Sequence, residues 1–338
     1  MTRPLRSLGF LTIGLFDREN PRAGHETTLS IIERGERLGF DSAWLRDRHL
    51  QYGISSPVAM LAAASQHTSR IRLGTAVIPL GWENPLRLAE DLATVDVLTG
   101  GRLEPGFSVG PPHRLDEIAP ALYPDTADRE DFGYERLARL RRFLAGDAVS
   151  PFAGTEGIEE YSERIEPHAP GLADRLWYGA GSPASTIWAA ENGFHLLTSS
   201  VIQSVHSTDF DAEQDAQIRL YRDTHSDGEN ARVSQGLVVV PTDTATPEQR
   251  RRYEAYAESR RGRVGIPQGP RRMLFAEDLV GTSEEIADRL LSSRSFPQVD
   301  EVAFALPFSF EPDDYAQILE DIAGRLGPLL GWAPVAPA

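Results

Sequence analysis

Residues 71–102, IRLGTAVIPLGWENPLRLAEDLATVDVLTGGR, read as a strand, a loop, an amphipathic helix and the start of a second strand. Apolar and β-branched residues fill the predicted strand, which is bounded by Gly74 and Pro79. We expect the helix to start with Asn84 as its cap and Pro85 in its first turn, where a missing N–H costs nothing. A strand–helix–strand unit predicts a parallel sheet, whose chemistry lies at the carboxyl ends of its strands.

Composition narrows the function classes. The chain has 338 residues, no cysteine and a formal net charge of −16. This charge argues against a nucleic-acid or anionic-membrane partner, and the lack of cysteine excludes disulfides and thiolate catalysis. No apolar segment approaches the roughly 20 residues of a membrane helix. We therefore expect a cytoplasmic protein, and since no metal-ligand spacing is found, we expect no metal site.

Strand patterns alternate with helical patterns along the whole chain, which predicts an α/β fold, a TIM (β/α)8 barrel. The seventh strand is predicted at 237–240. We expect one domain over 1–330, with a long insertion at about 111–173 and a basic, glycine- and proline-rich loop at about 259–280 that acts as a mobile lid. Residues 331–338 are expected to form a flexible tail.

Four segments, in order, resemble the bacterial luciferase-like family of flavin-dependent monooxygenases. They are RGERLGFDSAWL (34–45), the GTAV, ENP, AEDL and GGR motifs within 74–102, LWYGAGSPASTIWAAENG (176–193) and GTSEEIADRL (281–290). The resemblance implies a TIM barrel that binds reduced FMN, usually supplied by a separate flavin reductase. Reaction with O2 would give a C4a-(hydro)peroxyflavin that oxygenates a small apolar organic substrate. It also implies a cytoplasmic homodimer.

A glycine- and hydroxyl-rich turn is the candidate phosphate site. Gly179, Gly181, Ser182, Ser185 and Thr186 lie between a predicted strand and a predicted helix. Glycine lets the backbone approach a phosphate, hydroxyls donate to it, and a helix N-terminus adds positive potential. An ordinary serine-capped turn is the alternative. The resemblance places the FMN phosphate here, with Ser182 and Ser185 at the family's two hydroxyl positions.

Two further cofactor positions rest on the resemblance. At Ala76 and Val77 the family often has a non-prolyl cis peptide that forms a bulge against the flavin ring; an ordinary strand end is the alternative. Val109 occupies a position where many members place an arginine near the phosphate. Arginines of the 259–280 loop could replace it: Arg263, Arg271 and Arg272.

The predicted catalytic segment is Arg46-Asp47-Arg48-His49, after the second strand. The family carries two consecutive histidines here, the first of them catalytic, whereas this chain has Arg48 and then His49. Arginine stays protonated at neutral pH and cannot act as a general base, but it can stabilise an anion. A structural, salt-bridged arginine is the alternative for Arg48.

Other side chains are candidates for the substrate pocket or the lid. Trp82 is expected at the pocket mouth, although a core or dimer-interface tryptophan is an alternative. His113 is a candidate pocket residue, and Phe308 and Phe310 are expected to line an apolar pocket. His195 is expected to serve strand packing.

An FMN-dependent monooxygenase is the first functional hypothesis. The second is an oxidoreductase that transfers hydride with a 5-deazaflavin. A third is a non-catalytic flavin-binding relative, and a cofactor-free barrel hydrolase is the weakest, since no acid–base pair converges from the strand ends.

Overall fold

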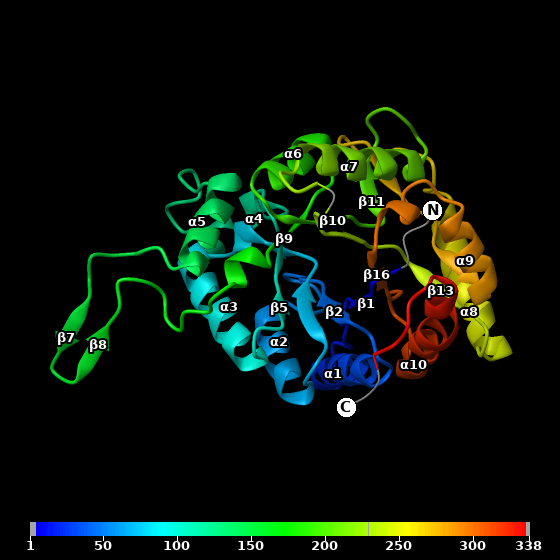
Figure 1. The fold of residues 1–338 in the computed structure, drawn as a ribbon, viewed down its shortest axis with the longest axis horizontal. Coiled ribbons are helices and arrows are strands. Elements are labelled where there is room, and N and C mark those ends of the chain that lie inside the picture. Colours follow the sequence, from blue (N-terminus) through cyan, green and yellow to red (C-terminus); the bar gives the residue numbers. More distant parts are fainter. Residues whose placement is uncertain (1–4, 229, 336–338) are drawn as a thin grey trace.

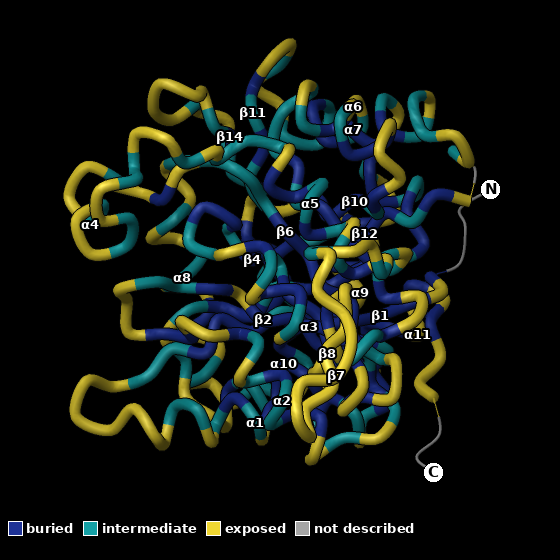
Figure 2. The backbone as a smooth tube through the Cα atoms, turned by 90° about the vertical axis from the view of Figure 1, so that its left-hand side faces the viewer, coloured by how far each residue is buried: buried dark blue, intermediate teal, exposed yellow. Residues whose placement is uncertain are grey.

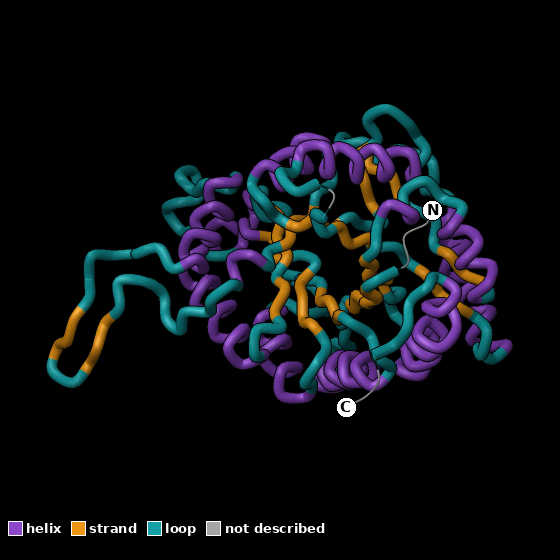
Figure 3. Tube along the Cα trace, viewed as in Figure 1, coloured by secondary structure: helices purple, strands orange, loops and turns teal. Residues whose placement is uncertain are grey.

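The computed structural model describes residues 5–228 and 230–335. A ring of strands lies inside a ring of helices (Figures 1 and 3). The ring strands pair in parallel, so their carboxyl ends all meet at one end of the barrel, here called the mouth. The predicted α/β barrel is thereby confirmed.

Two barrel strands are each broken once. The first runs as β3 (Arg72–Thr75) and β4 (Ile78–Pro79), and the second as β5 (Leu103–Glu104) and β6 (Gly106–Ser108). Thr75 Oγ1 donates to the carbonyl of Gly106 and accepts from its N–H, both at 2.9 Å. Because β3 pairs with β5 and β4 with β6, the broken strands close the sheet on itself.

The remaining barrel strands are β1 (Ser7–Thr12), β2 (Ser42–Leu45), β9 (Trp177–Gly179), β10 (His195–Leu197), β12 (Val233–Gln235) and β16 (Glu301–Ala305). With each broken strand counted once, eight strands form the ring.

The outer helices are α1 (Pro21–Arg37), α2 (Pro57–His67), α3 (Pro85–Thr99), α5 (Tyr134–Ala145), α6 (Pro183–Glu191), α7 (Phe210–Thr224), α8 (Pro247–Arg261), α9 (Ser283–Leu291) and α10 (Pro312–Asp321). Shorter turns are η1 (Leu80–Trp82), η2 (Leu172–Asp174), η3 (Phe296–Gln298), η4 (Ile322–Leu326) and α11 (Gly327–Leu329). None of the helices in the described ranges is both long and apolar enough to cross a membrane.

Helix α3 confirms the predicted capping. Asn84 Oδ1 accepts from the N–H groups of Leu86 at 3.0 Å and Arg87 at 3.3 Å. The helix then ends at Gly100, whose φ of 67° is the left-handed conformation that favours glycine.

Apolar side chains fill two layers. Inside the barrel, Trp44 and Trp177 meet edge to face with ring centroids 5.5 Å apart, and Leu197 and Ala303 pack with them. A larger core lies between the strands and the helices, so burial is greatest in the ring and least in the outer loops (Figure 2).

The predicted seventh strand at 237–240 is wrong. The barrel strand is β12, whereas Val239–Pro241 forms β13 and pairs with β15 (Leu279–Gly281). Strand β12 escaped prediction because its buried residues include Ser234 and Gln235. The side-chain amide of Gln235 donates to Gln214 and to Ser295 Oγ, which lie outside the strand. These partners make a buried polar residue acceptable in β12, and a search for apolar runs does not detect such a strand.

The predicted insertion contains α4 (Leu115–Leu122), α5, η2 and a hairpin of β7 (Gly154–Glu156) and β8 (Glu159–Tyr161). The hairpin extends far from the barrel (Figure 1) and every residue of both strands is exposed. A backbone hydrogen bond of 2.7 Å from Val149 to Glu163 closes its base.

The predicted lid loop has regular structure of its own. Strand β14 (Met273–Phe275) pairs antiparallel with β11 (Val201–Gln203), and 259–280 also includes the end of α8 and the start of β15. Of the predicted tail, Trp332 is buried and its Nε1 donates to Asp41 Oδ2 at 2.8 Å. Residues 336–338 lie outside the described part of the chain.

Candidate active site

Arg48 lies at the barrel mouth. Its guanidinium carbon is 5.3 Å from the ring centroid of Phe308, which follows β16, and its Nη1 donates to Gln51 Oε1 at 3.0 Å. Its Nε is shielded from solvent and has no hydrogen-bond partner among the described residues. Burial lowers the pKa of the Arg48 guanidinium. Arg48 and Phe308, which the sequence predicted separately as a catalytic and a pocket residue, therefore lie together. No residue of the described ranges forms a salt bridge with Arg48.

His49 belongs to a second group beside the mouth. Its ring stacks on Trp82 with centroids 4.2 Å apart and an interplanar angle of 15°. Its Nε2 lies 3.1 Å from Oδ2 of Asp47, whose side chain is fully buried. Glu83 completes the group, and its pKa is raised by burial first and by the charge of Asp47 second. Although neither atom of this contact has a hydrogen-bond partner among the described residues, a histidine beside a buried carboxylate is suited to hold or move a proton.

The sequence prediction gave no role to Asp47 or Glu83, although Asp47 lies in the predicted catalytic segment and Glu83 follows Trp82 at the expected pocket mouth. The ligating atoms of Asp47, His49 and Glu83 all lie within 4.8 Å of one another, although the spacing of the sequence predicted no metal site. These donor types can share a proton or hold a cation. The signal in the sequence that could have indicated this group was the Asp-x-His order of Asp47 and His49, together with the position of Glu83 next to Trp82.

A buried arginine fixes the loop that carries Trp82 and Glu83. Arg136 on α5 is 3% exposed and forms an ion pair with Glu130. Its Nη1 donates to the carbonyls of Glu83 and Leu80. The loop therefore presents Trp82 to His49 from a position set by the insertion.

The peptide bond between Ala76 and Val77 is cis, as the resemblance implied. Both side chains pack with the tryptophan cluster inside the barrel. Gly179, at the end of β9, faces Val77: a Cβ added to Gly179 would lie 2.8 Å from Val77 Cγ1. Glycine is needed here for close packing, and the structure brings these candidate cofactor residues together.

The next turn caps helix α6. Ser182 Oγ accepts from the N–H of Ser185 at 3.3 Å, and Ser185 Oγ accepts from the N–H of Ser182 at 3.1 Å. Thr186 is fully buried, and its hydroxyl bonds to the Ser182 carbonyl and to Gln217. Thr186 thus has a structural role in the fold, whereas both serine hydroxyls stand at a helix N-terminus, where an anion is favoured.

A cavity of about 210 Å³ adjoins this turn, between α6, α7 and β11. Its lining includes Ser182, Gln203, His206 and Gln217. A Cβ added to Gly181 would meet only the Met273 side chain, at 3.9 Å, so the backbone at this glycine is open. The donors and the open backbone on the α6 side of the cavity fit a phosphate group, whereas the buried carboxylate of Glu213 lines its α7 side.

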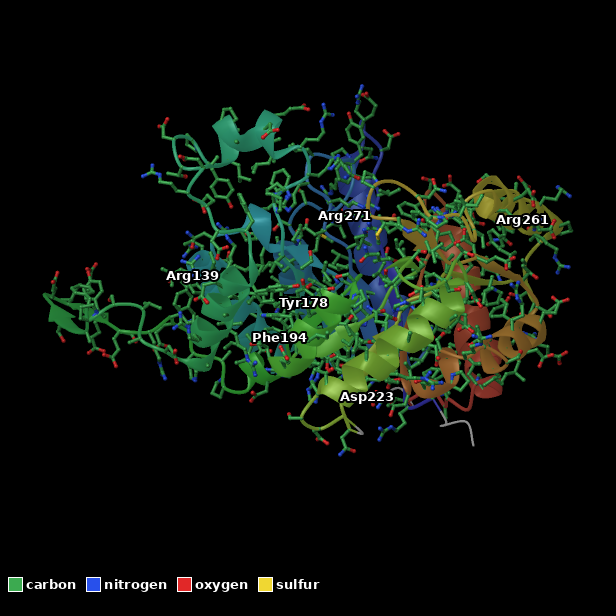
Figure 4. All side chains as sticks on the ribbon, turned by 90° about the horizontal axis from the view of Figure 1, so that it is seen from above. Arg139, Tyr178, Phe194, Asp223, Arg261 and Arg271 are labelled. Atoms are coloured by element: carbon green, nitrogen blue, oxygen red, sulfur yellow. The ribbon has the colours of Figure 1, made fainter. Side chains whose placement is uncertain are left out.

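Two of the candidate arginines flank the same region. Arg272 is exposed and its Nη2 donates to Ser204 Oγ at 3.3 Å. Arg271 is exposed at the mouth end of the barrel (Figure 4). Asp223, in the last turn of α7, lies at the other end of the barrel in the same view. Arg263 instead lies over the Phe275 ring, 4.3 Å from its centroid.

Three other candidates lie elsewhere. The N–H of Val109 bonds to the Tyr178 hydroxyl, and its side chain packs against the hydrophobic core. His113 is exposed. Phe310 packs among aromatic residues of the outer layer, with its ring 5.0 Å from that of Tyr253.

Together, these features define a parallel α/β barrel whose candidate site lies at the carboxyl ends of the strands. The sequence model of the luciferase-like monooxygenases matches residues 9–297. The chain belongs to this family.

Curated relatives match parts of the chain. Limonene 1,2-monooxygenase of Rhodococcus erythropolis is 35% identical over 177 residues, which cover 47% of this chain and 44% of that protein. The chain thus spans less than half the length of this relative. An F420-dependent glucose-6-phosphate dehydrogenase of Kribbella flavida is 27% identical over 290 residues, covering 75% of this chain and 82% of that protein.

Solved structures share the fold. Apo-MsnO8 superposes with a TM-score of 0.73 at 19% identity, covering 99% of this chain and 100% of that one. The oxygenating constituent of 3,6-diketocamphane monooxygenase from Pseudomonas putida, in complex with FMN, gives a TM-score of 0.65 at 12% identity, with 99% and 100% coverage. At these identities the likeness concerns the fold alone.

Proposed function

We propose that the protein is an FMN-dependent monooxygenase that uses reduced FMN and O2 to oxygenate a small organic substrate. The observation that carries this proposal is the arrangement at the barrel mouth. Val77 packs against Gly179 at the end of β9, and the serine-capped start of α6 follows directly. On the other side of the mouth are Arg48 and His49, which could act on a reacting group.

The residues present fit the cofactor. Ser182, Ser185 and the N-terminus of α6 would hold the phosphate, with Arg271 or Arg272 adding positive charge. The surface at Ala76 and Val77 would support the flavin ring. Bound reduced FMN would supply the electrons that activate O2.

The chain's own residues have three tasks. His49, paired with Asp47, holds or accepts a proton, and Arg48 stabilises negative charge near the reacting atoms. Trp82 and Phe308 exclude water from the mouth, and the 259–280 segment closes over it as a lid.

The decisive experiment is an anaerobic titration of the purified protein with reduced FMN, and with a reduced 5-deazaflavin as comparison. Selective binding of reduced FMN supports the proposal, and O2 consumption with an added flavin reductase then allows a substrate screen. If neither cofactor binds, the monooxygenase proposal fails.

Hydride transfer with a deazaflavin is the second candidate. It is favoured by the Kribbella flavida relative, named for an F420-dependent activity, which matches over 75% of this chain. Selective deazaflavin binding in the same titration would replace the first proposal with this one.

We also propose a homodimer that packs through α2 and α3. Val97 and Leu98 on α3 are 55% and 50% exposed, and Ala62 and Ala63 on α2 permit close helix approach. Sedimentation of the wild type and of L98E tests this: the variant should shift to monomer.

A further inference from the structure

Arg46 and Arg48 lie at the mouth end of β2, on either side of Asp47 in the sequence. Side chains alternate along a strand, so Arg46 extends the face of Trp44, whose ring contacts Trp177 inside the barrel. Arg46 is exposed, and Arg48 lies over Phe308. Both guanidinium groups therefore belong to the barrel mouth.

Neither arginine has a counter-ion. The one carboxylate between them, on Asp47, is 3.1 Å from His49, and no carboxylate of the described ranges forms an ion pair with Arg46 or Arg48. Yet the chain has 50 acidic residues against 34 basic ones, so acidic partners are abundant. Arg46 and Arg48 differ from the chain's paired arginines in lying two residues apart at the barrel mouth, with one of them stacked on an aromatic ring.

At the opposite end of the barrel, where the strands begin, two arginines form ion pairs with glutamates. Arg72 and Arg232 both contact Glu104, at 2.9 and 3.0 Å, and Arg232 also contacts Glu301 at 2.6 Å. At the mouth, Arg46 is only partly exposed, and partial desolvation by the surrounding protein, followed by the like charge of Arg48, lowers its pKa to about 10. The folded protein thus keeps two cations close together without an internal anion to stabilise them.

We propose that Arg46 and Arg48 bind an anionic group of the substrate, a carboxylate or a comparable oxyanion attached to an apolar, preferably aromatic, body. Two planar guanidinium groups match the geometry of such an oxyanion, and the Phe308 ring offers an apolar surface beside them. This assignment rests on the proposed function, since it names the substrate class of that site. The anion has one other possible source, the cofactor itself.

A matched pair of fluorescent probes tests the charge requirement. Anilinonaphthalene sulfonate has an aromatic body and one sulfonate, and phenylnaphthylamine is the same body without it. Each is titrated into flavin-free wild type and into R46Q, R48Q and R142Q. Arg142 is the matched control, because its side chain is 59% exposed and it lies on the outer helix α5 rather than at the end of a barrel strand.

We expect the wild type to prefer the sulfonate, and R46Q and R48Q each to weaken sulfonate binding by about tenfold, the scale of one charge-assisted hydrogen bond. Binding of the neutral probe should stay unchanged, as should every affinity of R142Q. Equal affinity of the wild type for both probes, or unchanged sulfonate binding in R46Q and R48Q, would overturn the proposal. Thermal unfolding confirms that each variant is folded.

Anaerobic titrations of the same variants with reduced FMN and reduced riboflavin separate the two sources of the anion. Unchanged reduced-FMN affinity, together with lost sulfonate affinity, assigns the arginines to the substrate. Weaker reduced-FMN binding in R46Q or R48Q assigns them to the cofactor and overturns the proposal; unchanged riboflavin binding would then locate the contact at the phosphate. If the wild type binds no flavin but R46Q and R48Q still lose the sulfonate, the proposed function fails while the anion site stands.

Discussion

At the scale of single residues, close packing at the mouth depends on a glycine, whose lack of a side chain makes room for a neighbouring residue. Gly179 leaves room for the branched Val77 side chain, whose stiffness at χ1 leaves it little freedom to move aside. Gly181, two residues later, faces open space. The two glycines therefore have different roles despite their proximity in the sequence.

We predict that G179A destabilises the protein by about 1–3 kcal/mol, the usual cost of overpacking a filled site. Its new methyl group would lie 2.8 Å from Val77 Cγ1. G181A is the matched control, since its methyl group would meet only Met273 at 3.9 Å. Urea unfolding measures both, and equal stabilities of G179A and the wild type would contradict the packing argument.

Glu83 gives a pH-dependent prediction. Because its pKa is raised in the folded state, the folded protein holds this proton where the unfolded chain has lost it. The contribution of Glu83 to the free energy of unfolding therefore falls as pH rises from the ordinary glutamate pKa of the unfolded chain through the raised pKa of the folded protein. E83Q should be more stable than the wild type at neutral pH and equal to it at pH below about 4. Thermal unfolding across pH checks this, and a difference that does not change with pH would exclude it.

At the scale of elements, the sequence correctly predicted the features that neighbouring residues determine, such as helix capping and the alternation of strands and helices. Asn84 and Pro85 define the start of α3, and the alternation of strands and helices predicts the barrel. Strand β12 was misplaced because tertiary hydrogen bonds, rather than an apolar pattern, satisfy Gln235. The stacking of His49 on Trp82 and the approach of Glu83 to Asp47 are also tertiary, and so is the lack of an acidic partner for Arg46 among the described residues.

The loop η1 offers a test at this scale. R136M removes the donor to the Glu83 and Leu80 carbonyls and leaves Glu130 unpaired. We expect a loss of about 2–3 kcal/mol in unfolding free energy, since buried acceptors lose their partner. R142M on the same helix should change stability by less than about 0.5 kcal/mol. Denaturant unfolding compares the two, and similar losses would mean that Arg136 does not anchor the loop.

At the scale of the whole molecule, the two ends of the barrel divide structure from chemistry. The amino ends of the strands carry the closed network of Arg72, Glu104, Arg232 and Glu301, which satisfies its own charges. The mouth carries arginines without an ion pair in the described ranges, a histidine stacked on a tryptophan and the serine-capped N-terminus of α6. Charges that find no partner in the chain are free to bind a ligand.

The hairpin of β7 and β8 lies apart from both ends. Its strands are exposed throughout, and Ile158 at its turn is 98% exposed. Replacing 152–162 by a short Gly-Ser linker should therefore change the unfolding free energy of the barrel by less than about 0.5 kcal/mol. Urea unfolding at low protein concentration measures this, and a loss several times larger would show that the hairpin supports the barrel.

The closed base of that hairpin has a practical consequence. Since Val149 and Glu163 are joined by a backbone hydrogen bond, the chain leaves the barrel and returns to it at one point. A folded domain whose own termini are close together can be spliced in there without cutting the barrel. Under the proposed function, a flavin reductase inserted at this position would be tethered beside the barrel, and the high local concentration of reduced cofactor would make a one-chain oxygenase possible.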